Sequence, residues 1–122
     1  MEFPHVVQKP WGREIWFANN EQKNYCGKEL VITQDWQLSL HRHPVKDEVF
    51  YLIQGEMLVE TSDREDGTNR KQLTLQPGAC FHVPAGLWHR MRAVTPVRLI
   101  EASTFHRDDD VERLEPSCYC GV

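Results

Sequence analysis

The stretch "SLHRHPVKDEVFYLIQG" (residues 39–55) combines metal-binding residue types with a strand–turn–strand pattern. His41 and His43 are two residues apart, and side chains at this spacing point to the same face of a strand. After the turn "PVKD", Glu48 begins an apolar run that ends at Gly55. An antiparallel return would bring the Glu48 carboxylate back beside the two imidazoles. The stretch therefore predicts two adjacent strands that carry three candidate ligands of one metal ion.

The residues before His41 predict what its face of the strand looks like. Gln37 and Ser39 share the parity of His41, whereas Leu38 and Leu40 have the opposite parity. We therefore expect the imidazoles to face a polar pocket rather than the apolar core.

A second stretch, "PGACFHVPAGLWHRM" (residues 77–91), supplies a further candidate ligand, His89. Gly78, Pro84 and Gly86 are residue types that form turns and end strands, so we expect them to position this histidine. A fourth ligand of nitrogen or oxygen type would complete a metal site that leaves positions open for water or substrate. Trp88 is opposite in phase to His89 and is expected to pack in the interior.

The rest of the chain predicts an antiparallel all-β domain. Seven prolines and seven glycines separate short segments rich in β-branched and aromatic residues. We expect strands at residues 28–33, 36–41, 48–54, 56–62, 71–76, 79–84, 89–94 and 97–105. So many short strands imply a sandwich, jelly roll or barrel, and 122 residues fit one domain.

Both ends of the chain are expected to depart from this pattern. Residues 1–25 are aromatic and broken by proline, and we expect them to lie extended over the domain. In residues 108–122, three aspartates precede a short apolar pair with Pro116 after it, which predicts a helical turn followed by a tail.

Composition limits the partners and the location. A net charge of −4 without clustered Lys or Arg argues against nucleic acid and anionic membranes as partners. No segment resembles a leader or a bilayer span, so we expect a cytoplasmic protein. Its four cysteines, Cys26, Cys80, Cys118 and Cys120, are then expected to be free thiols, with the last two in a mobile tail.

Taken together, the two stretches resemble the paired motifs of the cupin superfamily. The first motif is HxH, four residues, E, six residues, G; the second is G, five residues, P-x-G, two residues, H. The chain has both at these spacings, although Ala93 stands where the second motif usually ends in Asn. The resemblance implies a single-domain cupin, a double-stranded β-helix or jelly-roll barrel. It also implies one divalent ion (Mn, Zn, Fe, Ni or Co) held by His41, His43, Glu48 and His89.

Within the cupins, the chain is similar to the C-terminal domain of type II mannose-6-phosphate isomerases. The likeness lies in "KPWGREIWF" (residues 9–17), "YCGKELVITQDWQLSLHRH" (residues 25–43) and "RLIEASTFHRDDDVERLE" (residues 98–115). His41 departs from that family, which tends to have Gln there, and "PSCYCG" (residues 116–121) replaces its acidic ending. The resemblance implies an isomerase of a sugar or sugar phosphate that acts through an enediolate.

Such a reaction needs a metal ion to polarise a carbonyl and a side chain to move a proton between adjacent carbons. Glu101 matches a Glu of the family and shares the parity of Val97 and Leu99, so we expect it to be the acid/base. Lys46 is the expected cation for a developing oxyanion.

Arg113 and Trp11 are the expected substrate-binding residues, although Trp11 could equally pack in the core or at a dimer contact. Arg90 and Arg92 are out of phase with His89 and should face away from the metal.

The same residues are compatible with two other functions. Three histidines and a glutamate also suit Fe(II), as in a dioxygenase that cleaves a small molecule with oxygen. The same fold could also serve as a non-catalytic sugar-binding or regulatory module. In each case the partner is a small molecule, and we expect a homodimer formed through edge strands.

Overall fold

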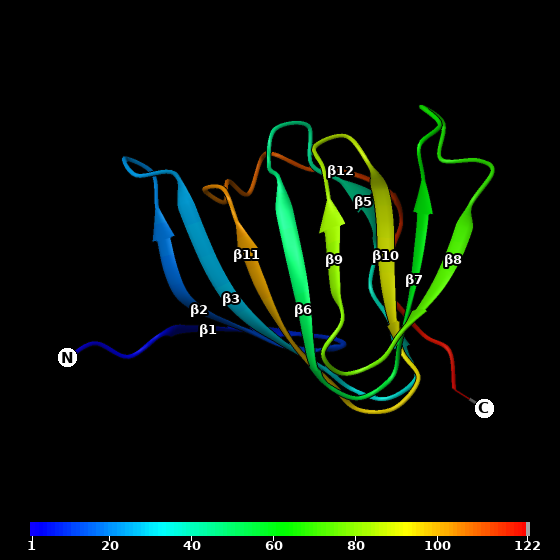
Figure 1. The fold of residues 1–122 in the computed structure, drawn as a ribbon, viewed down its shortest axis with the longest axis horizontal. Helices are drawn as coiled ribbons and strands as arrows, with labels where there is room; N and C mark the ends of the chain where they lie inside the picture. The colour runs from blue at the N-terminus through cyan, green and yellow to red at the C-terminus, as the bar shows by residue number, and fades with distance from the viewer. Residues whose placement is uncertain (122) are drawn as a thin grey trace.

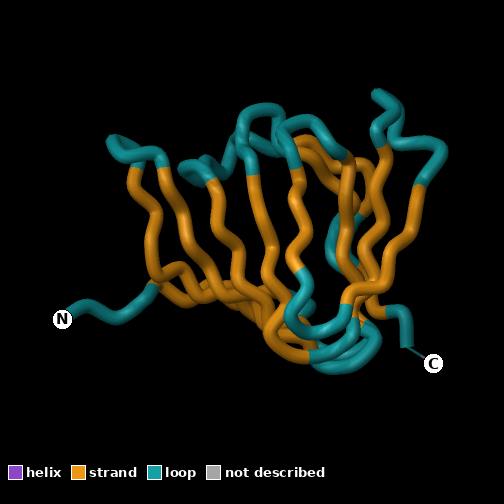
Figure 2. The backbone as a smooth tube through the Cα atoms, in the orientation of Figure 1, coloured by secondary structure: helices purple, strands orange, loops and turns teal. Residues whose placement is uncertain are grey.

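The computed structural model describes residues 1–121, and in this range the chain forms β-strands and no helix, which confirms the all-β prediction (Figure 2). The strands are β1 (His5–Lys9), β2 (Gly12–Asn20), β3 (Tyr25–Ile32), β4 (Trp36–Gln37), β5 (Leu40–Arg42), β6 (Glu48–Gln54), β7 (Met57–Ser62), β8 (Lys71–Leu75), β9 (Cys80–Val83), β10 (Trp88–Ala93), β11 (Val97–Ser103), β12 (Glu112–Glu115) and β13 (Cys118–Tyr119). No helical segment of these residues has the length and hydropathy needed to cross a bilayer.

The strands form two antiparallel sheets around a common interior (Figure 1). The first sheet has the order β1-β2-β3-β11-β6-β9. In the second, β10 pairs with β7 on one side and with β5 and β4 on the other, while β8, β12 and β13 extend it outward. This arrangement is the jelly-roll barrel expected from the sequence.

The expected strand at residues 36–41 is broken in two. Gln37 pairs with Arg92, and His41 pairs with His89. The chain therefore advances four residues from Gln37 to His41, whereas β10 advances three from His89 to Arg92. The extra residue makes a bulge, which reverses the side-chain parity between Gln37 and His41. Leu38 therefore turns into the core, and the prediction that Gln37 shares the face of His41 is wrong.

The predicted C-terminal helical turn is also wrong. Residues 108–110 form a turn, and the chain then continues as β12 and β13, which pair with β5 and β4. An extended chain satisfies the backbone groups at this sheet edge, whereas a single helical turn bears the full cost of nucleation. The Asp110 carboxylate accepts hydrogen bonds from the backbone N–H groups of Val45 and Lys46, at 2.9 Å each, and so orders the 43–47 turn.

The N-terminal segment is extended, as expected, but it belongs to the first sheet. β1 and β2 form a hairpin, and β2 pairs with β3 along its length. Trp11, at the turn of this hairpin, is only 6% exposed and packs in the hydrophobic core.

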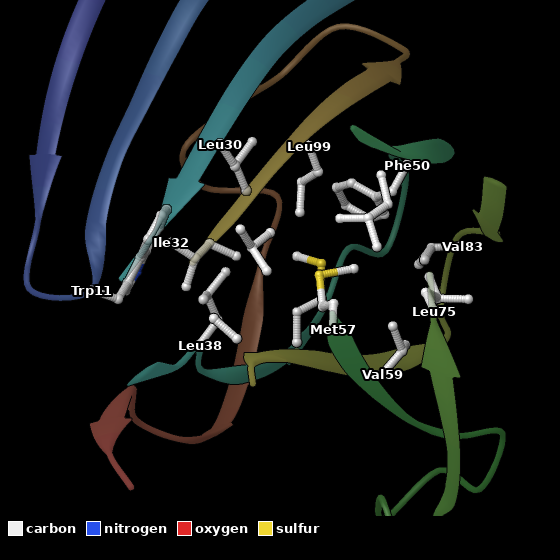
Figure 3. Packing of buried hydrophobic residues seen from close by; sticks show 14 residues of the cluster. Trp11, Leu30, Ile32, Leu38, Phe50, Met57, Val59, Leu75, Val83 and Leu99 are labelled. Carbon is white, nitrogen blue, oxygen red and sulfur yellow. The ribbon is translucent and has the colours of Figure 1, made fainter. Parts of the chain in front are cut away.

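The interior of the barrel is apolar at one end and polar at the other. Figure 3 shows the apolar end, where side chains from both sheets point toward one another. Along β3, β11 and β6, the inward positions change from apolar residues to Lys28, Glu101 and Glu48. Lys28 lies opposite Glu101 in the register, so these charges gather at the same end of the barrel. The candidate functional residues lie there.

Two motif glycines allow a direct test of the fold. Gly55 and Gly78 have φ angles of 92° and 94°, in the region that favours glycine. A Cβ atom at Gly55 would lie 2.2 Å from the Pro96 carbonyl oxygen, whereas one at Gly78 would meet nothing within 4 Å. Gly78→Ala should therefore cost about 1–3 kcal/mol from backbone strain alone, and Gly55→Ala should cost more. Denaturant unfolding measures both, and equal losses would contradict the close approach at Gly55.

Candidate metal centre

Three imidazoles from the second sheet and its adjoining loop converge at the polar end of the barrel. His41 lies in β5, His43 directly follows β5, and His89 lies opposite His41 in β10. The ring centroids of His41 and His89 are 4.6 Å apart, and those of His41 and His43 are 5.0 Å apart. One nitrogen of each ring lies within 4.8 Å of the others, so the three residues form a group that can hold a metal ion.

The hydrogen bonds of the imidazoles suit this role. Their Nδ1 atoms contact backbone carbonyl oxygens: Ser39 for His41 at 3.0 Å, Asp110 for His43 at 2.6 Å, and Leu87 for His89 at 3.0 Å. A carbonyl only accepts, so each Nδ1 carries the hydrogen and each Nε2 keeps a lone pair for a metal. The His89 Nε2 atom is buried without a hydrogen-bond partner, as expected of a nitrogen that coordinates a metal ion.

Burial keeps two of these rings in the metal-binding form. It lowers the pKa of His41 well below the usual value, and the neighbouring His89 and His43 lower it further. Burial likewise lowers the pKa of His43, although Glu48 opposes the shift. Both imidazoles are therefore neutral near pH 7, which is the state that coordinates metal.

Glu48 approaches the imidazoles from the opposite sheet. It opens β6, so the prediction that it lies on a strand adjacent to the histidines is wrong: the 43–47 turn carries the chain from one sheet to the other. Its Oε2 atom is 3.3 Å from His89 Nε2, and its Oε1 atom is 3.8 Å from His43 Nε2. The 3.3 Å contact is not a hydrogen bond, because both atoms remain unpartnered; two electron-pair donors therefore face each other, an arrangement that a cation bound between them would stabilise.

The Glu48 side chain is an ionised carboxylate. Burial raises its pKa, but His89, Lys46 and His43 outweigh burial and hold the pKa at about 2. A buried, charged oxygen without a hydrogen-bond partner needs a cation nearby. Glu48 is thus well placed for its predicted role as the fourth ligand.

Lys46 is buried rather than exposed in its turn. Its side chain is 2% exposed, and Nζ lies 2.6 Å from Glu101 Oε2 and 3.3 Å from Glu48 Oε1. Burial lowers the pKa of Lys46, but Glu101 and Glu48 outweigh it and raise the pKa overall. The ammonium therefore stays charged and links the candidate acid/base to a candidate metal ligand.

His106 is a site residue that the sequence did not reveal. Its Nδ1 atom lies 3.1 Å from Lys46 Nζ and 3.2 Å from Lys28 Nζ, and its Nε2 atom lies 3.0 Å from Asp108 Oδ1. Ammonium groups only donate, so Nδ1 accepts and Nε2 carries the hydrogen. Burial, helped by the two lysines, lowers the pKa of His106. Because His106 lies in an irregular loop, no periodicity marks it.

Lys28 is a second site residue that was not predicted, although its position in the strand pattern could have revealed it. It shares the parity of Leu30 and Ile32, and a lysine on the apolar face of a strand is unusual. Its ammonium lies 3.9 Å from the centroid of the Trp16 ring and 3.6 Å from Glu14 Oε1. These contacts hold the charge inside the barrel.

The polar end encloses a cavity of about 370 Å³, a size typical of small-molecule sites. Both residues predicted to bind substrate line it: Trp11, which is also part of the core, and Arg113, which is exposed on β12. Arg90 and Arg92 lie outside it, and Arg90 pairs with Glu60 and Glu115. The prediction that these two arginines face away from the metal is confirmed.

The fold and site define a class of protein: a jelly-roll barrel with a small-molecule cavity and a group of histidines that can hold a divalent ion. The family model of the cupin domain matches residues 30–103, more than half of the chain. The chain therefore belongs to the cupin family.

Individual relatives extend the comparison. The uncharacterized protein YdbB of Bacillus subtilis is 28% identical over 101 residues, which cover 81% of this chain and 79% of YdbB. KdgF from Halomonas sp. matches with a TM-score of 0.72 at 20% identity, over 88% of this chain and 98% of that one.

Two larger proteins contain a similar barrel. Oxalate decarboxylase from Bacillus subtilis matches with a TM-score of 0.79 at 17% identity, and the capsular polysaccharide assembling protein CapF from Staphylococcus aureus with 0.79 at 14%. The matches cover 91% and 92% of this chain but only 30% and 34% of those chains. Likeness to solved structures at such low identity shows the fold alone.

Metal loading tests the centre. Metal-free protein should bind one equivalent of Mn²⁺, an ion that prefers nitrogen and oxygen ligands to thiolates. At a free concentration of 100 Kd, binding should stabilise the fold by about 2.7 kcal/mol.

His89→Gln should weaken Mn²⁺ binding by at least the roughly 10–100-fold that loss of a supporting partner costs. His82→Gln, at a half-exposed surface position, is the control. Calorimetry and thermal unfolding measure the effect; no Mn²⁺-dependent shift in the unaltered protein would contradict the site.

A double-mutant cycle tests the buried ion pair. Lys46→Met leaves two buried carboxylates without their cation and should cost about 3–5 kcal/mol of unfolding free energy. Adding Glu101→Gln should recover part of this, with a coupling of about 0.5–3 kcal/mol. The exposed pair Arg98–Glu29 provides the control cycle, with a coupling of about 1 kcal/mol at most. Strict additivity at Lys46 and Glu101 would show that the pair is not coupled.

Proposed function

We propose that this protein is a metal-dependent isomerase that interconverts the aldose and ketose forms of a sugar phosphate. The observation that carries the proposal is the position of Glu101: its carboxylate is 4% exposed and lines the same cavity as the histidine group. Lys46 holds it there, in contact with Glu48 as well. An aldose–ketose isomerase needs this combination of a metal site and a separate acid/base.

Each residue then has a defined task. A divalent ion on His41, His43, Glu48 and His89 would polarise the carbonyl of the substrate. Glu101 takes a proton from the carbon beside the carbonyl and returns it to the neighbouring carbon. Lys46 keeps its positive charge and offers it to the oxygens of the enediolate.

The apolar part of the cavity supports the proton transfer. Leu30, Leu38, Phe50 and Met91 line the cavity behind the charged residues, and all four are buried. An apolar wall keeps water away from the reacting carbons, so a proton held by Glu101 returns to the substrate rather than to solvent.

The charge of the cavity favours a phosphorylated substrate. Its lining has five cationic side chains and four carboxylates, a formal charge of +1 in a chain whose net charge is −4. A divalent ion would raise this to +3, which attracts an anion. The cations are Lys9, Lys28, Lys46, Arg107 and Arg113, and the carboxylates are Glu14, Glu48, Glu101 and Asp108. Arg107 and Arg113 are exposed, so they are the candidates for contact with a phosphate.

The resemblance to type II mannose-6-phosphate isomerases supports the same choice. In the sequence, Glu101 and Arg113 match a Glu and an Arg of that family's closing segment. His41, where the family tends to have Gln, would give this protein one more imidazole on its metal.

The experiment is an assay of Mn²⁺-loaded protein with a panel of aldoses and their phosphates, with ketose formation as the readout. We expect turnover of a phosphorylated aldose and less of its unphosphorylated form. Glu101→Gln should lower turnover by about 10²–10⁴-fold while Mn²⁺ binding persists. Glu29→Gln, which removes a carboxylate paired with Arg98 instead, should have no effect.

Two outcomes would overturn the proposal. Oxygen consumption without ketose formation, in Fe²⁺-loaded protein, would indicate a dioxygenase. Binding of sugars by calorimetry without turnover, unchanged by Glu101→Gln, would indicate a non-catalytic binding module.

A further inference from the structure

Cys118 and Cys120 are held close together at the edge of the second sheet. Their sulfur atoms are 3.6 Å apart. Cys118 pairs with Gln37 through β13, and the Cys120 N–H donates to the Asp35 carbonyl at 2.7 Å. The prediction of a mobile tail is therefore wrong for these residues. Because the chain is extended here, side chains two residues apart share a face.

The distance between the sulfurs is close to the separation of two thiolates bound to one metal ion. A tetrahedral ion with metal–sulfur bonds of about 2.3 Å separates two thiolates by about 3.8 Å. Chelation would thus need little movement from the observed 3.6 Å. A disulfide would need a sulfur–sulfur distance of about 2.0 Å, and an extended strand places the two Cα atoms near the upper limit of about 6.8 Å for such a bond. The arrangement therefore suits chelation better than oxidation.

Polar and cationic side chains surround the two sulfurs. Gln37 Nε2 approaches Cys118 Sγ at 3.6 Å, and Arg92 lies next to Gln37 in β10. Burial and the neighbouring Cys118 raise the pKa of Cys120 overall, although Arg92 and Arg90 oppose the shift. Two sulfurs this close resist carrying two negative charges, and a cation bound between them removes that repulsion.

We propose that Cys118 and Cys120 form a second metal site, which binds soft, thiophilic ions such as Cd²⁺, Zn²⁺ or Cu⁺. Two metal–sulfur bonds form, two thiol protons go to solvent, and water or a free thiol fills the other positions. The site is separate from the histidine group, since neither cysteine lines the cavity. It does not depend on the isomerase activity, and its ligand chemistry differs from the nitrogen and oxygen set inside the barrel.

The test is a Cd²⁺ titration of reduced protein that carries His41→Gln and His89→Gln, so that the cavity group is removed. The thiolate-to-metal charge-transfer absorption should saturate at one equivalent, with release of the thiol protons. Cys118→Ser and Cys120→Ser should each abolish this absorption and weaken binding by about 10²-fold or more, because chelation is lost. Cys80→Ser removes an exposed cysteine elsewhere and should have no effect.

The controls separate this site from nonspecific thiol binding. Thermal unfolding should show that each serine variant remains folded, which is expected because Cys118 and Cys120 are not core residues. Equal Cd²⁺ affinity with and without either cysteine would overturn the proposal. The same is true of a comparable loss in Cys80→Ser.

Discussion

The polar end of this barrel depends on one buried cation. Lys46 contacts Glu48 and Glu101, two carboxylates on neighbouring strands of the first sheet. Without the ammonium, both carboxylates would be buried with like charge close together, a costly arrangement. The Asp110 carboxylate orders the turn around Lys46 through two backbone hydrogen bonds, and the Asp110 carbonyl accepts from His43. One aspartate therefore supports both the cation and a candidate metal ligand.

The division of the interior into two ends reconciles stability with function. The apolar end supplies a continuous core from both sheets, and this burial offsets the cost of desolvating charges at the other end. The same strands serve both ends: β11 carries Val97 and Leu99 into the core and Glu101 into the cavity. A rigid core beneath the site also limits how far the imidazoles and carboxylates can move.

Much of the fold and part of the site were predictable because they depend on local rules. Strand alternation placed Glu101 on the inward face with Leu99, and motif spacing selected His41, His43 and His89 as one group. The break between β4 and β5 was not predictable, because a bulge follows from pairing with β10 rather than from the residues themselves. For the same reason β12 was mistaken for a helical turn: short segments take the structure that an available sheet edge offers.

The sequence by itself determined the all-β class, the turn glycines and the identity of the candidate metal ligands, since these depend on residue type and on a period of two. Only the tertiary structure decided that Glu48 faces the histidines from the opposite sheet, that Lys46 is buried, and that His106 and Lys28 join it. It also brought the Cys118 and Cys120 sulfurs together on an ordered edge strand. Such contacts depend on strands and loops that are far apart in the chain. They exist only once the two sheets close around a common interior.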